Sequence, residues 1–176
     1  MNNLFVEIVR KASELRWCTR PYCTTCGNRE VRTELRNIAG KNGFQLADIL
    51  SALKPAEIVT LPNWQDCVQL AFFEISLPGT QEKVLESWLP EIDNQIHFAD
   101  VVLYYVIRTL PFRESVGKNW IERCIALSNT SRNESLVESL LFVLGRKSEA
   151  YPDFLSFARQ FESSPKIQKA LRKAMS

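Results

Sequence analysis

The sequence predicts an all-α protein built from about ten helices in stacked antiparallel hairpins. Apolar residues recur at helical spacing along most of the chain. Glycine and proline are scarce, with six and eight among 176 residues, whereas a β-sandwich needs many punctuating turns. The only strand-like run is residues 57–61, which is too short to predict a sheet.

The first two predicted helices cover residues 3–16 and 28–39 and form an N-terminal hairpin within residues 1–41. Leu4, Ile8, Ala12 and Leu15 share one face of the first helix. Val31, Leu35 and Ile38 share one face of the second, and Gly40 is expected to close it.

A repeat follows over residues 43–175, with helix-starting signals near residues 43–44, 78–79, 112–113 and 147–148. The spacing is about 34–35 residues, and breaks at 61–62, 90–94, 129–133 and 163–165 divide each repeat into two helices. The sequence therefore predicts four further hairpins in a single domain covering residues 1–176. The first helices carry one apolar stripe, as in 84–92 and 116–125, so one face should stay in water. The segments 98–110 and 136–144 are apolar on most sides and should be the most buried.

Residues with helix-capping side chains mark several of these boundaries. Asn63 (or Pro62 before it), Thr80 and Asn133 are candidate N-caps. Gly145 follows the last apolar residue of its helix, where a left-handed glycine often ends a helix.

The paired helices and their period resemble HEAT or armadillo repeats at the level of architecture. The small and aromatic residues of the tetratricopeptide pattern do not recur at fixed offsets. The resemblance to HEAT repeats implies a scaffold that binds protein or nucleic acid, and it implies no enzymatic activity.

Three of the five cysteines, Cys18, Cys23 and Cys26, lie within nine residues between the first two helices. Cys23 to Gly27 has the C-x2-C-G form and resembles a zinc knuckle, in which two thiolates hold one metal ion from a tight turn. The resemblance predicts a structural zinc ion held by these three thiolates. Residues that could supply the fourth ligand are Cys67, Cys124, His97 and Glu30, although both cysteines also fit core positions.

Three other interpretations of this segment remain open. A redox pair at a helix start would have Cys23 activated by the helix dipole and by Arg20 and Arg29. The C-x4-C-x2-C spacing also matches a plant-type ferredoxin loop, which belongs to a β-rich fold. Finally, the thiols could be unligated.

Charge is unevenly distributed although the net charge is only +2. Residues 1–41 carry +4, residues 42–107 carry −7 and residues 108–176 carry +5. The acidic middle, which includes Glu82, Glu86, Glu91 and Asp93, is expected to dock a basic partner, unless the segregation reflects only solvated faces. The basic ends could contact nucleic acid.

No catalytic motif and no phosphate-binding glycine loop is present, and the single histidine removes most triad chemistry. The longest apolar run, residues 101–107, is too short for a membrane span, and no signal peptide is apparent. We therefore expect a cytoplasmic, non-enzymatic adaptor that binds a protein partner and holds a structural zinc ion. The alternatives are a nucleic-acid-associated helical protein and a thiol-redox protein that uses Cys23 and Cys26.

Overall fold

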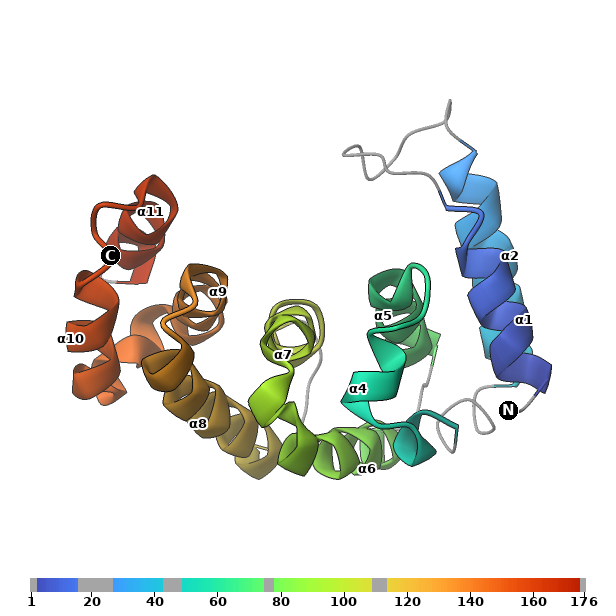
Figure 1. Ribbon diagram of the computed structural model, residues 1–176, viewed down its shortest axis with the longest axis horizontal. Coiled ribbons are helices and arrows are strands. Elements are labelled where there is room, and N and C mark those ends of the chain that lie inside the picture. The colour runs from blue at the N-terminus through green and yellow to red at the C-terminus, as the bar shows by residue number, and fades with distance from the viewer. Residues whose placement is uncertain (1–2, 16–26, 43–48, 75–77, 109–113, 175–176) are drawn as a thin grey trace. The chain divides into compact units, whose positions relative to one another are not determined.

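A computed structural model describes residues 3–15, 27–42, 49–74, 78–108 and 114–174 of the chain (Figure 1). Within these ranges every regular element is a helix and no strand occurs, which confirms the all-α prediction. Backbone contacts group the chain into two compact units, Met1–Glu91 and Ile92–Ser176. The sequence predicts a single domain over residues 1–176 with an N-terminal hairpin over residues 1–41, and this organisation stays a prediction. None of the described helices is long and apolar enough to cross a bilayer.

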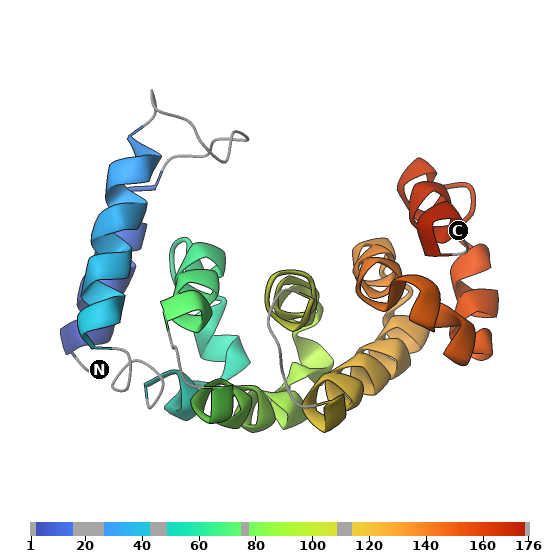
Figure 2. The same cartoon turned by 180° about the vertical axis from the view of Figure 1, so that it is seen from behind.

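The N-terminal unit begins with α1 (Asn3–Ala12) and α2 (Asn28–Lys41), which lie side by side in both views (Figures 1 and 2). The helix α1 ends before the predicted residue 16, because residues 13–14 form a turn. The prediction that Gly40 closes α2 is wrong, since the helix continues through it to Lys41. Asn42 ends the helix instead: its backbone N–H donates to Ala39 O at 3.0 Å and its side chain donates to Ile38 O at 2.9 Å.

A short helix, α4 (Pro55–Ile58), replaces the strand-like run at 57–61. Proline fits the first turn of a helix because its missing N–H has no intrahelical acceptor there. The Glu57 carboxylate accepts a hydrogen bond from the Lys54 backbone N–H at 2.9 Å, which closes a capping interaction. Pro55 and the capping hydrogen bond of Glu57 thus favour a helix here, although the residues that follow have a high β propensity.

The rest of the N-terminal unit contains a helical turn at residues 49–52, α5 (Trp64–Glu74) and α6 (Pro78–Trp88). Trp88 is fully buried, and its ring lies 5.5 Å from that of Phe72 on α5. Its indole Nε1–H donates to Leu50 O at 2.9 Å and to Leu53 O at 3.1 Å. The tryptophan therefore ties three segments of this unit together. The 3₁₀ helix η1 (Leu89–Asn94) follows α6.

The C-terminal unit contains α7 (Ile96–Val102), the π-helical turn η2 (Leu103–Ile107) and α8 (Glu114–Ser131). It continues with α9 (Glu134–Leu144), the 3₁₀ helix η3 (Gly145–Ala150), α10 (Pro152–Arg159) and α11 (Pro165–Ala174). The helix α9 lies between α7–η2 on one side and α11 on the other, and it also packs on α8 (Figure 1). The helices α7, α9 and α11 thus form a row, which we call the inner row.

The most buried segments are those that the sequence predicted. Residues 98, 99, 101–103 and 106 are buried in α7 and η2, and six residues of α9 are buried. The stripe on α8 is confirmed by buried Val116, Trp120 and Cys124. Apolar periodicity therefore placed the core of this unit correctly.

Some of the predicted helix caps are confirmed and others are wrong. The Asn133 side chain accepts a hydrogen bond from the Leu136 backbone N–H at 3.0 Å, and Gly145 ends α9 with a φ of 49°. The prediction for Thr80 is wrong because α6 already begins at Pro78. Asn63 precedes α5, but its side chain donates to Ala12 O and thereby links α5 to α1.

Candidate functional site

The predicted zinc ligands Cys18, Cys23 and Cys26 lie outside the described residues. Gly27, directly after them, has a φ of 75°, a left-handed conformation that L side chains rarely adopt. A side chain at this position would therefore be strained. Glu30 lies exposed in the first turn of α2.

The other two cysteines are core residues, as predicted. Cys67 and Cys124 are 5% and 0% exposed, and burial raises the pKa of each thiol to about 12. A thiol with such a pKa stays protonated at neutral pH, which makes it a poor metal ligand and a poor redox nucleophile. His97 lies exposed on α7, and no cluster of metal-binding side chains occurs in the part of the chain that the structure describes.

The acidic residues of the middle block do not form one free surface. Glu82 is only 5% exposed, Glu91 lies 3.7 Å from the Lys54 ammonium, and Asp93 pairs with Arg123. Glu86 lies exposed on α6. A docking role for the block as a whole therefore has little geometric support.

An unexpected feature is the π-helical turn η2. The Arg108 backbone N–H bonds to Leu103 O at 3.2 Å, five residues back rather than four. Single π turns inside helices are rare and are often found at functional sites. Here the turn lies beside α9 and α8, contains Tyr104 and ends at Arg108.

Tyr104, Arg108, Phe142 and Lys173 come together on the inner row, and we call them the basic–aromatic surface. The Arg108 guanidinium lies 4.9 Å from the centre of the Tyr104 ring and 5.7 Å from that of Phe142. The Lys173 ammonium lies 5.5 Å from the Phe142 ring, and the two rings meet edge to face at 6.2 Å. Two cations thus share one phenyl ring, a contact favoured by the negative face of the ring.

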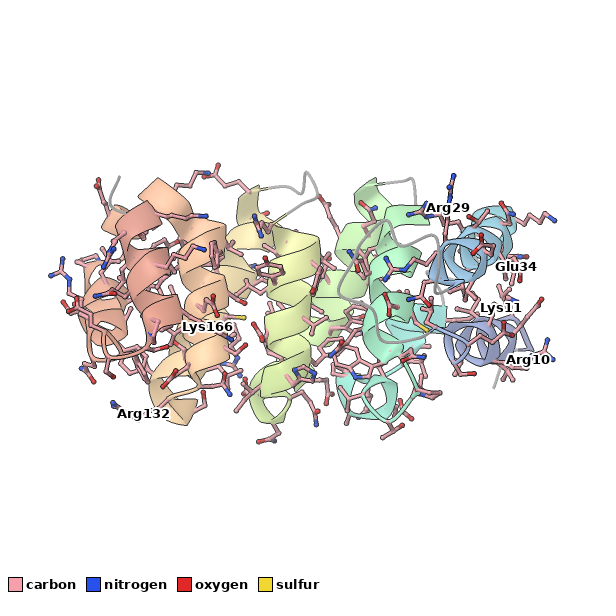
Figure 3. All side chains as sticks on the ribbon, turned by 90° about the horizontal axis from the view of Figure 1, so that it is seen from above. Arg10, Lys11, Arg29, Glu34, Arg132 and Lys166 are labelled. Carbon is pink, nitrogen blue, oxygen red and sulfur yellow. The ribbon has the colours of Figure 1, made fainter. Side chains whose placement is uncertain are left out.

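The basic–aromatic surface continues along α11. Lys166 and Lys169 precede Lys173 by seven and four residues, so helical spacing places them on the same face of α11. Lys166 is labelled in Figure 3, which looks onto the inner row. The helix carries no carboxylate, and its apolar face is buried.

Two carboxylates lie near the basic–aromatic surface. Asp100, one turn before Tyr104, accepts hydrogen bonds from the Ser135 hydroxyl at 2.7 Å and from the Ser139 hydroxyl. It therefore fixes α7 against α9. Glu138, one turn before Phe142, is half-buried. The surrounding charge is still positive, because the cations are Arg108 and three lysines of α11.

A cavity of about 340 Å³ opens where η2, α8, α9 and η3 meet. Its charged lining residues are Arg108, Lys118, Lys147 and Glu114. Lys118 also lies 3.7 Å from the exposed Glu122 carboxylate on α8, and Tyr151, which directly precedes α10, also lines the cavity. Arg108 thus belongs both to the basic–aromatic surface and to the cavity.

Sequence reasoning missed both features. Each combines residues from at least three segments that are far apart in the sequence, and no short motif links them. The available signals were the apolar-flanked tyrosine pair at residues 104–105 and the run of cations in residues 166–173. Neither signal indicates by itself that the two segments meet across α9.

Comparisons with known proteins do not assign the chain to a family. No protein-family model, no curated protein and no solved structure matches the chain.

Proposed function

We propose that this protein is a non-enzymatic scaffold that binds a protein partner through the basic–aromatic surface of its C-terminal unit. The observation that carries the proposal is the convergence of Tyr104, Arg108, Phe142 and Lys173 from three segments of the inner row. The resemblance to HEAT repeats, whose stacked hairpins present extended binding surfaces, supports the same proposal.

The composition of this surface fits a protein interface. Tyrosine and arginine are enriched among the residues that dominate binding energy, and both aromatic rings here are half-buried before any partner arrives. A half-buried ring is already oriented, so little side-chain entropy is lost on binding. The excess of cations favours a partner segment that carries carboxylates, which would form charge-assisted hydrogen bonds with Arg108.

Site-specific photo-crosslinking in cells tests the proposal. A benzoylphenylalanine at position 104 should give a defined adduct with one protein, whereas the same residue at the exposed position 129 on α8 should not. The double variant Arg108→Glu, Lys173→Glu should abolish the adduct. The control Lys41→Glu, Lys83→Glu makes the same change in net charge in the N-terminal unit and should retain it. An adduct that persists in the first variant would overturn the proposal, as would the absence of any adduct.

A nucleic-acid partner is the second candidate, and α11 favours it. This helix carries four cations and no carboxylate, and aromatic rings beside cations can stack on bases. The two candidates differ in salt dependence with a single-stranded oligonucleotide. A nucleic-acid protein should bind it with an affinity that falls steeply with salt and that drops in Lys166→Gln, Lys169→Gln. The protein-binding proposal predicts no saturable binding.

We also propose that Cys18, Cys23 and Cys26 hold a structural zinc ion in the N-terminal hairpin. The spacing of the cysteines and the left-handed Gly27 support it. The three thiolates would stabilise the connection between α1 and α2, and a fourth ligand such as Glu30 would complete a tetrahedral site. The redox alternative requires a disulfide between Cys23 and Cys26 in place of the metal.

A further inference from the structure

We infer that the cavity between η2, α8, α9 and η3 binds a small amphiphilic anion, a phosphate or carboxylate group attached to an apolar ring or chain. This inference goes beyond the proposed scaffold function and does not depend on it. It rests on the size of the cavity, its charge and its apolar wall.

The charge of the lining selects an anion. Arg108, Lys118 and Lys147 line the cavity, and Glu114 is the one carboxylate among its described lining residues, while the Lys118 ammonium also lies 3.7 Å from the Glu122 carboxylate. Lys147 makes no ion pair with any residue that the structure describes, so its ammonium is available to a ligand. Charge-assisted hydrogen bonds from lysine to phosphate or carboxylate are about twice as strong as neutral ones.

The first turn of α8 adds to this potential. The helix is 18 residues long and begins at Glu114, and Glu114, Gly117 and Lys118 from its first two turns line the cavity. The helix dipole places positive potential at the N-terminal end of a helix. An anion in the cavity would therefore lie near Lys147 and near the positive end of α8.

Part of the cavity lining is apolar. It is formed by Ile107, Ile121, Val143 and Leu144. A bare inorganic ion would leave this wall in contact with water, whereas a ring or short chain would cover it. The volume of about 340 Å³ lies at the lower end of the range of about 300–1,000 Å³ that small-molecule sites occupy. A ligand with one anionic group and one ring fits these dimensions.

Gly117 provides a way to block the cavity without changing its charge. A Cβ atom at this position would meet no heavy atom within 4 Å, and its backbone has an ordinary helical conformation. Gly117→Leu should therefore fold normally and place its side chain in the space that the ligand would occupy. Leucine is also the better helix former, which favours folding of the variant.

The test is a titration of the full-length protein followed by the backbone amide signals of Gly117, Lys118 and Lys147 in NMR spectra. The probes are phenyl phosphate, benzoate, inorganic phosphate and phenol. We expect saturable shifts with phenyl phosphate or benzoate, at an affinity at least about tenfold higher than for inorganic phosphate or phenol. Tighter binding of phenyl phosphate identifies a phosphorylated ligand, and tighter binding of benzoate identifies a carboxylate.

Three variants localise the binding. Gly117→Leu and Lys147→Gln should each weaken the better anion by about tenfold or more. Lys169→Gln removes the same charge from α11, outside the cavity, and should change the affinity less than twofold. The inference is overturned if neither anion gives saturable shifts, if Gly117→Leu binds as tightly as the natural protein, or if phenol binds as well as the anions.

Discussion

The pair α1–α2 and the helix α9 are held in place in different ways. Among the described side chains, α1 buries Ile8 and Ala12 and α2 buries Leu35 and Ala39. The α1–α2 pair is linked by the ion pair of Lys11 with Glu34, whose side chains face each other (Figure 3), and α2 is linked to α5 by Arg32 and Asp66 at 3.0 Å. In contrast, six of the eleven residues of α9 are buried.

This difference indicates that the two regions depend on different forces. Exposed ion pairs contribute only about 0–1 kcal/mol each, whereas burying a leucine side chain contributes about 1.5–3 kcal/mol. The inner row should therefore be stable through its own core. The α1–α2 pair depends more on what connects the two helices, which is the segment that contains the three clustered cysteines.

Metal removal should produce the largest difference between the two regions. If zinc joins α1 to α2, a strong chelator or low pH should remove hydrogen-exchange protection from both helices, while the amides of α9 stay protected. Cys23→Ser and Cys26→Ser should behave alike, because they share one ion, and Cys67→Ser should retain the metal. Protein purified under reducing conditions with less than about 0.2 equivalents of metal would defeat this prediction, since a structural site should be fully occupied.

Core truncation should be costly in either unit. Trp88→Ala and Leu141→Ala should each lower the free energy of unfolding by roughly 2–5 kcal/mol, as large-to-small core substitutions do. Trp88→Ala also removes the indole donor to two carbonyls. Urea unfolding followed by circular dichroism measures the change. A loss below about 1 kcal/mol at both positions would show that Trp88 and Leu141 do not belong to the cores of their units.

The link between α7 and α9 should contribute less than the core. Asp100→Ala leaves the hydroxyls of Ser135 and Ser139 without their acceptor and should cost about 1–3 kcal/mol in the free energy of unfolding. Ser135→Ala removes one of the two bonds and should cost less. Equal costs for the two variants would mean that the carboxylate contributes nothing beyond the single bond to Ser135.

The smallest effect should come from the ion pairs of α1. The hydrogen bonds that the Lys11 ammonium donates to the Glu14 carboxylate and then to the Glu34 carboxylate raise the pKa of Lys11 above its ordinary value of 10.5. A raised pKa in the folded state means that this stabilisation is present below pH 10.5 and is lost as the pH rises through the folded-state value. Because Lys11 is solvent-accessible, Lys11→Met should shift the unfolding midpoint only slightly at low salt and not at 1 M salt. A large shift that persists at 1 M salt would show that Lys11 contributes through packing instead.

Local chemistry made much of the fold predictable from the sequence. Asn133 accepts a hydrogen bond from its own helix and Gly145 ends that helix, so both signals lie within a few residues of the structure that they determine. The prediction for Gly40 failed for the same local reason, because Asn42 two residues later satisfies the helix carbonyls better.

What the sequence by itself determined is the helical class, most helix boundaries and the buried stripes, including Cys67 and Cys124. These features follow from the 3.6-residue period of apolar residues, which can be recognised within one segment without knowing what packs against it. Only the tertiary structure decided that Arg108 and Lys173, 65 positions apart in the sequence, approach the same ring of Phe142, and that Gly117 and Lys147 line one cavity. The physical reason is that these contacts depend on how α9 packs between η2 and α11, and that packing depends on the shapes of many side chains at once.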